Sequence, residues 1–295
     1  PAGGGAGEPG RRAQPRPRLP ADPPGHPQPD QRGTRTRGQA GGRAARKNLW
    51  PFALEGVDVI TLDDVVDQTR ACFAGRDVYF AASELPENLV LPGEWMDFGV
   101  VLKNEQRFPL SWNIFRNDLP WVFSLLERCL IGTVIVAGED VELAYIFHDA
   151  NGLYYYVGGL PLSSSSSSDN KFAALTGKLS RFYSSVHNGF TFFPARSMGP
   201  LKLEDVSFVS ELIDEEETSF ADDWMTIFSN GGGDYLAIDL NGQDQDKGII
   251  WWHEEPMDPE TDVNIFEIMD TWISIFLEDT QLRHEIIVYQ SDFRV

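Results

Sequence analysis

The chain has 295 residues, enough for one large or two modest domains, and a formal net charge of −21. Its only two cysteines are isolated, which argues against a disulfide scaffold and favours a reducing compartment. The charge is divided unevenly, with ten basic and three acidic residues in 1–47, and 14 basic and 42 acidic residues in 48–295. An acidic body of this kind repels nucleic acid and anionic membranes and attracts basic proteins.

Residues 1–47 are predicted to be a disordered tail. Gly, Pro, Arg and Ala occupy 35 of the 47 positions and no aromatic residue is present. The stretch therefore cannot bury enough apolar surface to offset the entropy lost on ordering. Two interpretations stay open. The tail is a fragment edge or an over-extended gene start, or it is a basic arm that binds nucleic acid or the acidic body.

Residues 48–160 are predicted to form a small α+β domain with no assigned role. A helix is expected over Leu62–Phe73, with Thr61 as its N-cap, and another over Leu119–Leu130. The second helix begins the most apolar window of the chain, which Glu127 interrupts, so no membrane span is expected. Strands are expected at 78–82, 98–102, 133–137, 142–147 and 153–157, the last two joined by a turn at 149–152.

Six consecutive serines within 161–170 predict a flexible linker, followed by a second α+β domain over 171–295. A helix from Phe172 to Val186 is expected to end at the Asn188-Gly189 turn. Strands are expected at 190–193, 224–228, 235–240, 248–252 and 285–289, and helices at 204–212 and 263–277. This order predicts an antiparallel or mixed sheet with helices packed on one face.

Several segments of the second half resemble the SUKH superfamily, which includes Smi/Knr cell-wall regulators and many bacterial immunity proteins. The resemblance extends over roughly residues 170–280 and ends with the helix around 265–277. It implies a non-enzymatic α+β domain that binds proteins, in bacteria often a nuclease or deaminase toxin. One departure is that the Leu-Pro pair of the family lies at Leu160-Pro161, upstream of the serines. The segments are His187-Asn188-Gly189, Gly199–Leu203, Ser229–Tyr235, Asp239-Leu240, Gly248–Ile250 and Trp252–Glu254.

No motif of cofactor or metal chemistry is complete, so neither a cofactor nor a metal is predicted. A phosphate-binding loop would open a helix with Gly-Lys, whereas Gly231-Gly232-Gly233 precede a strand and adjoin Asp234. These glycines, like Asn188 and Gly189, are interpreted as structural turns. The acidic run from Asp239 to Asp246 lacks the ligand spacing of an EF-hand. His187, at a helix end, is interpreted as a cation that favours the helix dipole.

The leading hypothesis is a cytoplasmic immunity or adaptor protein that binds a basic toxin domain through an acidic surface, and the sequence does not indicate its oligomeric state. Trp251 and Trp252 alternate in a strand, so one is expected in the core and the other at the surface. A metal-dependent hydrolase that uses His253, Glu254, Asp239 and Asp258 is an alternative, and a regulatory scaffold is another. The predicted partner-binding residues are Asp222, Asp223, Asp234, Tyr235, Asp239, Trp252, Glu254 and Glu255.

Overall fold

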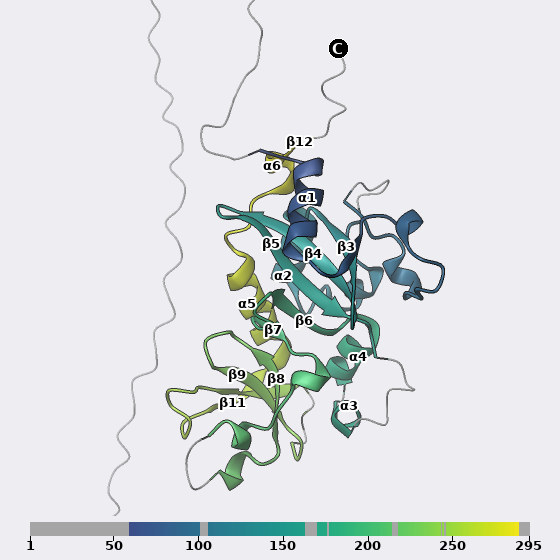
Figure 1. Ribbon diagram of the computed structural model, residues 1–295. Helices are drawn as coiled ribbons and strands as arrows, with labels where there is room; N and C mark the ends of the chain where they lie inside the picture. The colour runs from purple at the N-terminus through teal and green to yellow at the C-terminus, as the bar shows by residue number, and fades with distance from the viewer. Residues whose placement is uncertain are drawn as a thin grey trace, which may run out of the picture. The chain divides into compact units, whose positions relative to one another are not determined.

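The structure, a computed structural model, describes residues 59–100, 106–162, 170–175, 177–213, 218–242, 244 and 246–288 (Figure 1). The predicted tail and residues 163–169 of the predicted serine linker lie outside these residues. Within them, the chain forms two five-stranded antiparallel sheets, a short parallel pair of strands, and helices. The predicted α+β fold is therefore confirmed.

The elements follow one another in the chain as short strands and helices joined by brief loops. The helices are α1 (Leu62–Cys72), α2 (Pro120–Arg128), α3 (Asn170–Ala174), α4 (Gly177–Ser185), α5 (Ile265–Leu277) and α6 (Arg283–Ile286). The strands are β1 (Ile60–Thr61), β2 (Asp77–Tyr79), β3 (Gly132–Ala137), β4 (Val141–Asp149), β5 (Gly152–Gly159), β6 (Asn188–Phe193), β7 (Gly199–Pro200), β8 (Trp224–Ser229), β9 (Tyr235–Asp239), β10 (Lys247–Trp251), β11 (Glu260–Asn264) and β12 (Ile287–Val288).

The first sheet has the strand order β2-β3-β4-β5-β6, and both of its faces are buried. Alternate side chains of β4 therefore enter two different cores, as the period of a strand requires. Ala144 and Ile146 face α1, which crosses one face of the sheet, while Tyr145 and Phe147 enter the larger core that contains α2 (Figure 1). This double burial explains why β3 and β4 are almost continuously apolar.

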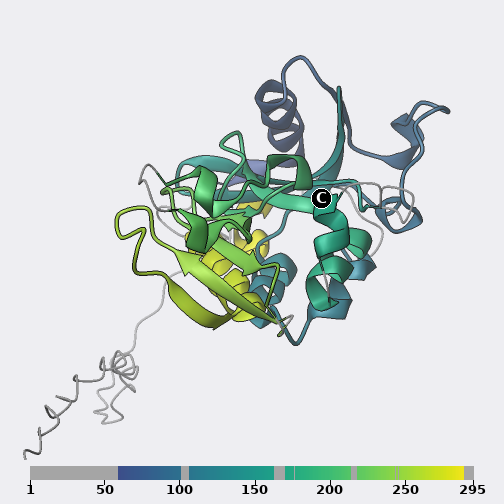
Figure 2. The same cartoon turned by 90° about the horizontal axis from the view of Figure 1, so that it is seen from below.

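The second sheet has the strand order β11-β10-β9-β8-β7. Helix α5 packs on one face and extends the larger core, where it contacts Leu236 and Ile250 of the strands. Figure 2 shows α5, in yellow, beside the yellow-green strands of this sheet. The opposite face has a small core of its own around Ala237 and Trp251, formed with the 3₁₀ turns of residues 209–221.

Several contacts join the parts of the chain on either side of the serine run. Strand β6 pairs with β5 across it, and the larger core takes residues from both sides. Asp270 of α5 accepts backbone N–H groups from Trp121 (3.2 Å) and Val122 (2.9 Å), in the first turn of α2. The division of the chain into domains 48–160 and 171–295 stays a prediction. The contacts described here connect residues of the first range with residues of the second.

Elements that are specified by neighbouring residues in the sequence form close to their predicted bounds. Helix α1 begins after Thr61, whose Oγ1 accepts the N–H of Asp64 at 3.1 Å, while the Asp64 carboxylate accepts the N–H of Thr61 at 3.0 Å. This reciprocal pair is a capping box, which fixes the start of the helix. Helices α2 and α5, the β4–β5 hairpin and strands β8 to β10 also form within about two residues of the predicted bounds.

Other predicted elements were wrong, and tertiary contacts explain the largest difference. The helix predicted at 204–212 is instead two 3₁₀ turns, because Val206 and Phe208 between them are extended and Ser207 is bonded to Thr226 of β8. The Thr226 hydroxyl accepts the Ser207 N–H at 3.1 Å and donates to its carbonyl at 3.0 Å. The predicted helix over 172–186 is divided into α3 and α4, and β11 was not predicted. The predicted strand at 98–102 lies partly outside the described residues.

Candidate protein-interaction site

The surface of the second sheet and its loops is strongly acidic. Residues 218–264 contain eleven Asp and Glu residues and one Lys. Within the described part of the chain, only two of the eleven form ion pairs: Asp246 with Lys178 at 3.7 Å and Asp234 with His253 at 2.7 Å. The other nine are all exposed. A basic partner would therefore meet carboxylates that carry no counter-charge from the protein.

The strand register divides the predicted contact residues between two ends of this sheet. Trp224 pairs with Asp239 at one end, and Ser229 pairs with Tyr235 at the other. Four residues of β9 separate the two ends, a distance of about 13 Å. We call Asp222, Asp223 and Asp239 the aspartate end, and Asp234, Tyr235, Trp252, Glu254 and Glu255 the tryptophan end.

Asp234, at the tryptophan end, is used inside the protein. Its Oδ1 accepts the backbone N–H of His253 at 3.0 Å and lies 2.7 Å from the His253 Nδ1, while its Oδ2 accepts the Asn230 side chain at 2.7 Å. Partial burial raises the pKa of Asp234, but the hydrogen bonds from His253 and Asn230 outweigh it and hold the pKa below its ordinary value. These bonds connect the glycine turn to the end of β10.

The glycine turn has the backbone conformation that glycine permits. Gly231 has φ of +83° and Gly233 has φ of +105°, both in the left-handed region. Gly189, after α4, has φ of +75°, and a Cβ there would lie 2.6 Å from the backbone nitrogen of Lys202. In the structure, Asn188 and Gly189 begin strand β6 instead of forming a separate turn, and Asn188 Oδ1 accepts the N–H of Leu203, in the segment that follows β7, at 2.9 Å.

The aromatic residues of the tryptophan end lie on opposite faces of the sheet. Trp251 is buried in the small core, with Tyr235 beside it at a ring distance of 6.2 Å. Trp252 is half-buried on the α5 face, 6.4 Å from Trp272, and its indole donates to Glu260 at 3.2 Å. A single flat partner surface therefore cannot cover both Tyr235 and Trp252. Glu254 and Glu255 are exposed in the loop beyond.

At the aspartate end, Asn241 joins two of the three carboxylates. Asp223 Oδ2 accepts the Asn241 side-chain amide at 2.6 Å, and Asp239 Oδ1 accepts the Asn241 backbone N–H at 2.9 Å. Asp222, Asp223 and Asp239 are all exposed. This end thus presents three carboxylates, two of them fixed in position by one asparagine.

The geometry that the hydrolase alternative requires is not present. Asp239 is the last residue of β9, whereas His253 follows β10 near the other end of β9, where Trp251 pairs with Tyr235. There His253 is hydrogen-bonded to Asp234. No group of three or more His, Cys, Asp or Glu side chains in the described residues is arranged to hold a metal ion. Those four residues therefore cannot form one metal centre in this conformation.

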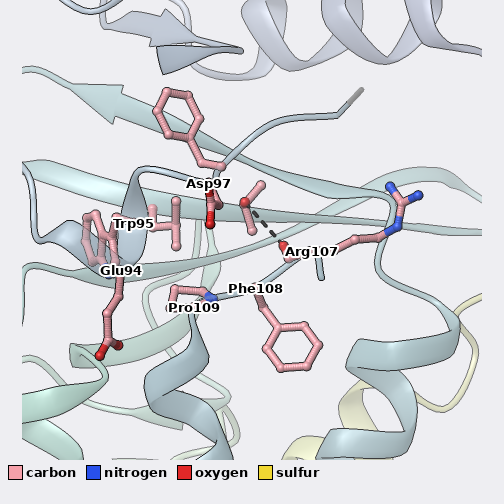
Figure 3. Close-up of a pocket in the computed structure, with 9 residues that line it drawn as sticks. Glu94, Trp95, Asp97, Arg107, Phe108 and Pro109 are labelled. Carbon is pink, nitrogen blue, oxygen red and sulfur yellow. Dashed lines mark hydrogen bonds between the residues drawn. The ribbon is translucent and has the colours of Figure 1, made fainter. Parts of the chain in front are cut away.

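A cavity between the 93–98 segment and Arg107–Pro109 is too small for a substrate (Figure 3). Its volume is about 10 Å³, room for about one water molecule. Arg107 closes one side through its carbonyl, which accepts the Thr133 hydroxyl at 3.3 Å. Trp95, which lines the opposite side, has a buried indole nitrogen that finds no hydrogen-bond partner among the described residues. This cavity is therefore a packing feature of the first sheet.

One buried charged group, Glu142 of β4, was not predicted from the sequence. Its carboxylate is fully buried and pairs with Arg76 at 2.7 Å, with Arg196 through both oxygens, and with Lys202 at 3.1 Å. Burial raises the pKa of Glu142, but hydrogen bonds from Arg196 and Arg76 and the charge of Lys202 lower it to about 2. The three cations lie 54 to 66 residues from Glu142 in the chain, so no local pattern could reveal them.

His187 is not the helix-end cation that the sequence suggested. It is fully buried, with Nδ1 3.1 Å from the Gly159 carbonyl and Nε2 2.7 Å from the Tyr145 hydroxyl. The carbonyl can only accept, so Nδ1 carries the proton and Nε2 accepts from Tyr145, which in turn accepts the Trp112 indole N–H at 2.8 Å. Burial lowers the pKa of His187 to about 3, so the ring is neutral.

The fold and surface define an α+β domain with a buried, paired carboxylate in the first sheet and an acidic surface on the second sheet and its loops. The SMI1 / KNR4 family (SUKH-1) matches residues 144–277, so this part of the chain is similar to that family. The match begins within β4, upstream of the start predicted from the sequence. Neither a curated protein nor a solved structure matches the chain significantly. None of the described helices is long and apolar enough to cross a membrane.

Proposed function

We propose that this protein binds another protein through the acidic surface of its second sheet, and that the partner is a basic toxin domain that it neutralises. The observation that carries the proposal is the set of nine exposed carboxylates in 218–264 without ion-pair partners among the described residues. The SMI1 / KNR4 domain supports it, because this family consists generally of non-catalytic regulatory or immunity modules.

Electrostatics favours a basic protein over other partners. Carboxylates at this density repel the phosphates of nucleic acids and anionic lipids, and they accelerate the approach of a cationic surface. A nuclease or nucleobase deaminase has such a cationic surface, because it must attract the phosphate backbone of its own substrate. The acidic sheet would then occupy the surface that the substrate needs. Both cysteines are free thiols, which fits the proposed location in a reducing cytoplasm.

Binding to the product of the neighbouring gene tests this proposal. The purified full-length chain is titrated with that product by calorimetry, at low and at high salt, and the host is challenged with the product in the presence and absence of the chain. We expect a one-to-one complex that weakens by about tenfold or more as screening increases, together with protection of the host.

A matched pair of variants separates the acidic sheet from general acidity. Charge reversal at Asp222, Asp223 and Asp239 together is expected to abolish tight binding. Reversal of Asp67 and Glu87, which are exposed on the first sheet's side of the chain, is expected to leave it unchanged. The toxin hypothesis is lost if the wild-type chain binds without protecting the host, and a regulatory adaptor then becomes the better description. The protein-binding proposal itself is lost if no complex forms.

A further inference from the structure

The aspartate end of the second sheet differs from the rest of the acidic surface because apolar side chains are exposed among its carboxylates. Phe220 is 38% exposed and Leu240 is 37% exposed, and the half-buried Trp224 lies beside Phe220 with ring centroids 5.4 Å apart. We call these three residues the aromatic pad. Exposed aromatic groups are enriched at the centres of protein interfaces, where each contributes a large apolar area.

The pad and the aspartates lie together at one end of the sheet. Trp224 is the cross-strand neighbour of Asp239, so the two side chains lie on the same face of the sheet. The N–H of Leu240 donates to the carbonyl of Asp223 at 2.9 Å, which fixes Leu240 beside the start of β8. Below the pad, Trp224 packs on the small core of Trp251 and Ala237, so the surface is supported from within.

From this arrangement we infer that the aromatic pad, rimmed by Asp222, Asp223 and Asp239, is the centre of the partner interface, and that the partner offers a basic surface with an apolar side chain. This inference rests on the proposed function, and it places the partner-binding surface at the aspartate end of the second sheet. An apolar centre surrounded by charged groups that exclude water is the usual arrangement of an interface hot spot.

Two other occupants fit the surface less well. A second copy of the chain in a two-fold dimer would place the aspartates of one protomer against those of the other, and like charges at close range oppose association. A nucleic acid would meet the same repulsion from its phosphates. At the tryptophan end, Met257 is 59% exposed, but no aromatic side chain there is as exposed, and Tyr235 and Trp252 face opposite ways.

Four variants of the full chain test the inference, with the neighbouring gene product as the binding partner. Phe220→Ala and Asp222→Lys change the pad and its rim, and Met257→Ala and Glu254→Lys make the corresponding changes at the tryptophan end. We expect about a 30-fold or greater loss of affinity for each pad variant and less than about threefold for each control. Hydrogen exchange on the wild-type complex, which needs no substitution, is expected to show protection at 219–224 and 239–242.

The outcomes separate this inference from the proposed function. Wild-type binding with losses confined to the tryptophan-end variants, or with no loss in any variant, overturns the pad and leaves the proposed function standing. Absence of wild-type binding defeats both. A concentration-dependent dimer that Phe220→Ala dissociates would assign the pad to a second copy, and this also overturns the inference. Unfolding curves for Phe220→Ala show whether its loss reflects folding, and Asp222→Lys, at an exposed position, provides the independent readout.

Discussion

Carboxylates of the two sheets differ in burial and in pairing. Glu142 of the first sheet is fully buried and neutralised by Arg76, Arg196 and Lys202. By contrast, Asp222 and its neighbours at one end of the second sheet are exposed and form no ion pair with another described residue. A buried carboxylate without partners would cost several kcal/mol, so its three partners are a condition of the fold. An exposed one contributes little to stability, so evolution can place it for a partner instead. Burial and ion pairing therefore distinguish a carboxylate that stabilises the fold from one that is free to contact a partner.

Two of the three histidines in residues 144–277 show the same contrast. His187 is enclosed by the aromatic rings of Trp95, Trp112 and Phe190, and has a fixed tautomer. His253 is exposed and pairs with Asp234 at the surface. The first is part of the core and the second holds a surface turn. From the sequence, His187 is interpreted as a helix-end cation and His253 as a residue of the hydrolase alternative.

The largest expected effect follows from neutralising Glu142. Glu142→Gln keeps the shape of the side chain but leaves Arg76, Arg196 and Lys202 without their counter-charge, so we expect a loss of about 3 kcal/mol in the free energy of unfolding. Urea denaturation measures it. Glu139→Gln, at an exposed position close by, is the control and is expected to change little. A loss below about 1 kcal/mol for Glu142→Gln would mean that the pairing is structurally dispensable.

Acid is expected to destabilise the protein through His187. Its pKa of about 3 in the folded state lies below the ordinary value of 6.5. Between these two pH values, His187 is therefore protonated in the unfolded chain and neutral in the folded chain. Stability is therefore present above pH 6.5 and falls by roughly 2 kcal/mol between pH 6.5 and 5. This window lies above the acid transition of Glu142, whose pKa falls from 4.5 to about 2 on folding.

Urea denaturation at several pH values gives this slope, and His187→Gln provides the comparison. Glutamine can still accept from Tyr145 and donate to Gly159, but it does not titrate. The slope between pH 5 and 6.5 is expected to be much smaller in the variant. An unchanged slope would show that another group causes the acid sensitivity.

A smaller effect is expected at Asp270, which joins α5 to α2. Asp270→Ala removes the acceptor of the Trp121 and Val122 N–H groups, so we expect a loss of about 1–2 kcal/mol. Asp270→Asn keeps an acceptor and is expected to cost less. Thermal unfolding compares both with Asp279→Ala, at an exposed position just after α5. Equal melting temperatures for Asp270→Ala and Asp279→Ala would contradict the capping role.

The smallest effect is expected at Asp222. Asp222→Asn is expected to change the free energy of unfolding by less than about 0.5 kcal/mol, because its carboxylate is exposed and makes no ion pair in the described part of the chain. The same urea experiment as for Glu142 gives the value. A loss above about 1 kcal/mol would make this aspartate structural and weaken its assignment to a partner.

Elements whose signals are local could be predicted from the sequence. The Thr61–Asp64 spacing fixes α1 and the turn residues at 149–152 fix the β4–β5 hairpin, because the interacting groups lie within a few positions. Strand β11 could not be predicted, because Glu260–Asn264 has no alternating apolar pattern and pairs with β10 mainly through its backbone. Residues 203–212 depend on Thr226 and Asn188, which lie outside that segment.

The candidate site was predicted in its chemistry but not in its geometry. The sequence indicated an acidic, tryptophan-containing surface on the strands from 224 to 252. It could not show which cross-strand neighbours Asp239 and Tyr235 have, because the pairing register decides this. Phe220 and Leu240 were not singled out, since a partly exposed apolar side chain in a loop has no distinguishing pattern.

The link from Asp270 to α2 has a consequence for any shortened version of the protein. A fragment limited to the family-matched residues 144–277 would lack β3, the partner of β4, and α2, against which α5 packs. Phe266 would lose its stacking partner Phe115, and a buried carboxylate would lose both of its donors. The family segment of this chain therefore depends on residues before it to remain folded, and a working fragment must begin upstream of Trp112.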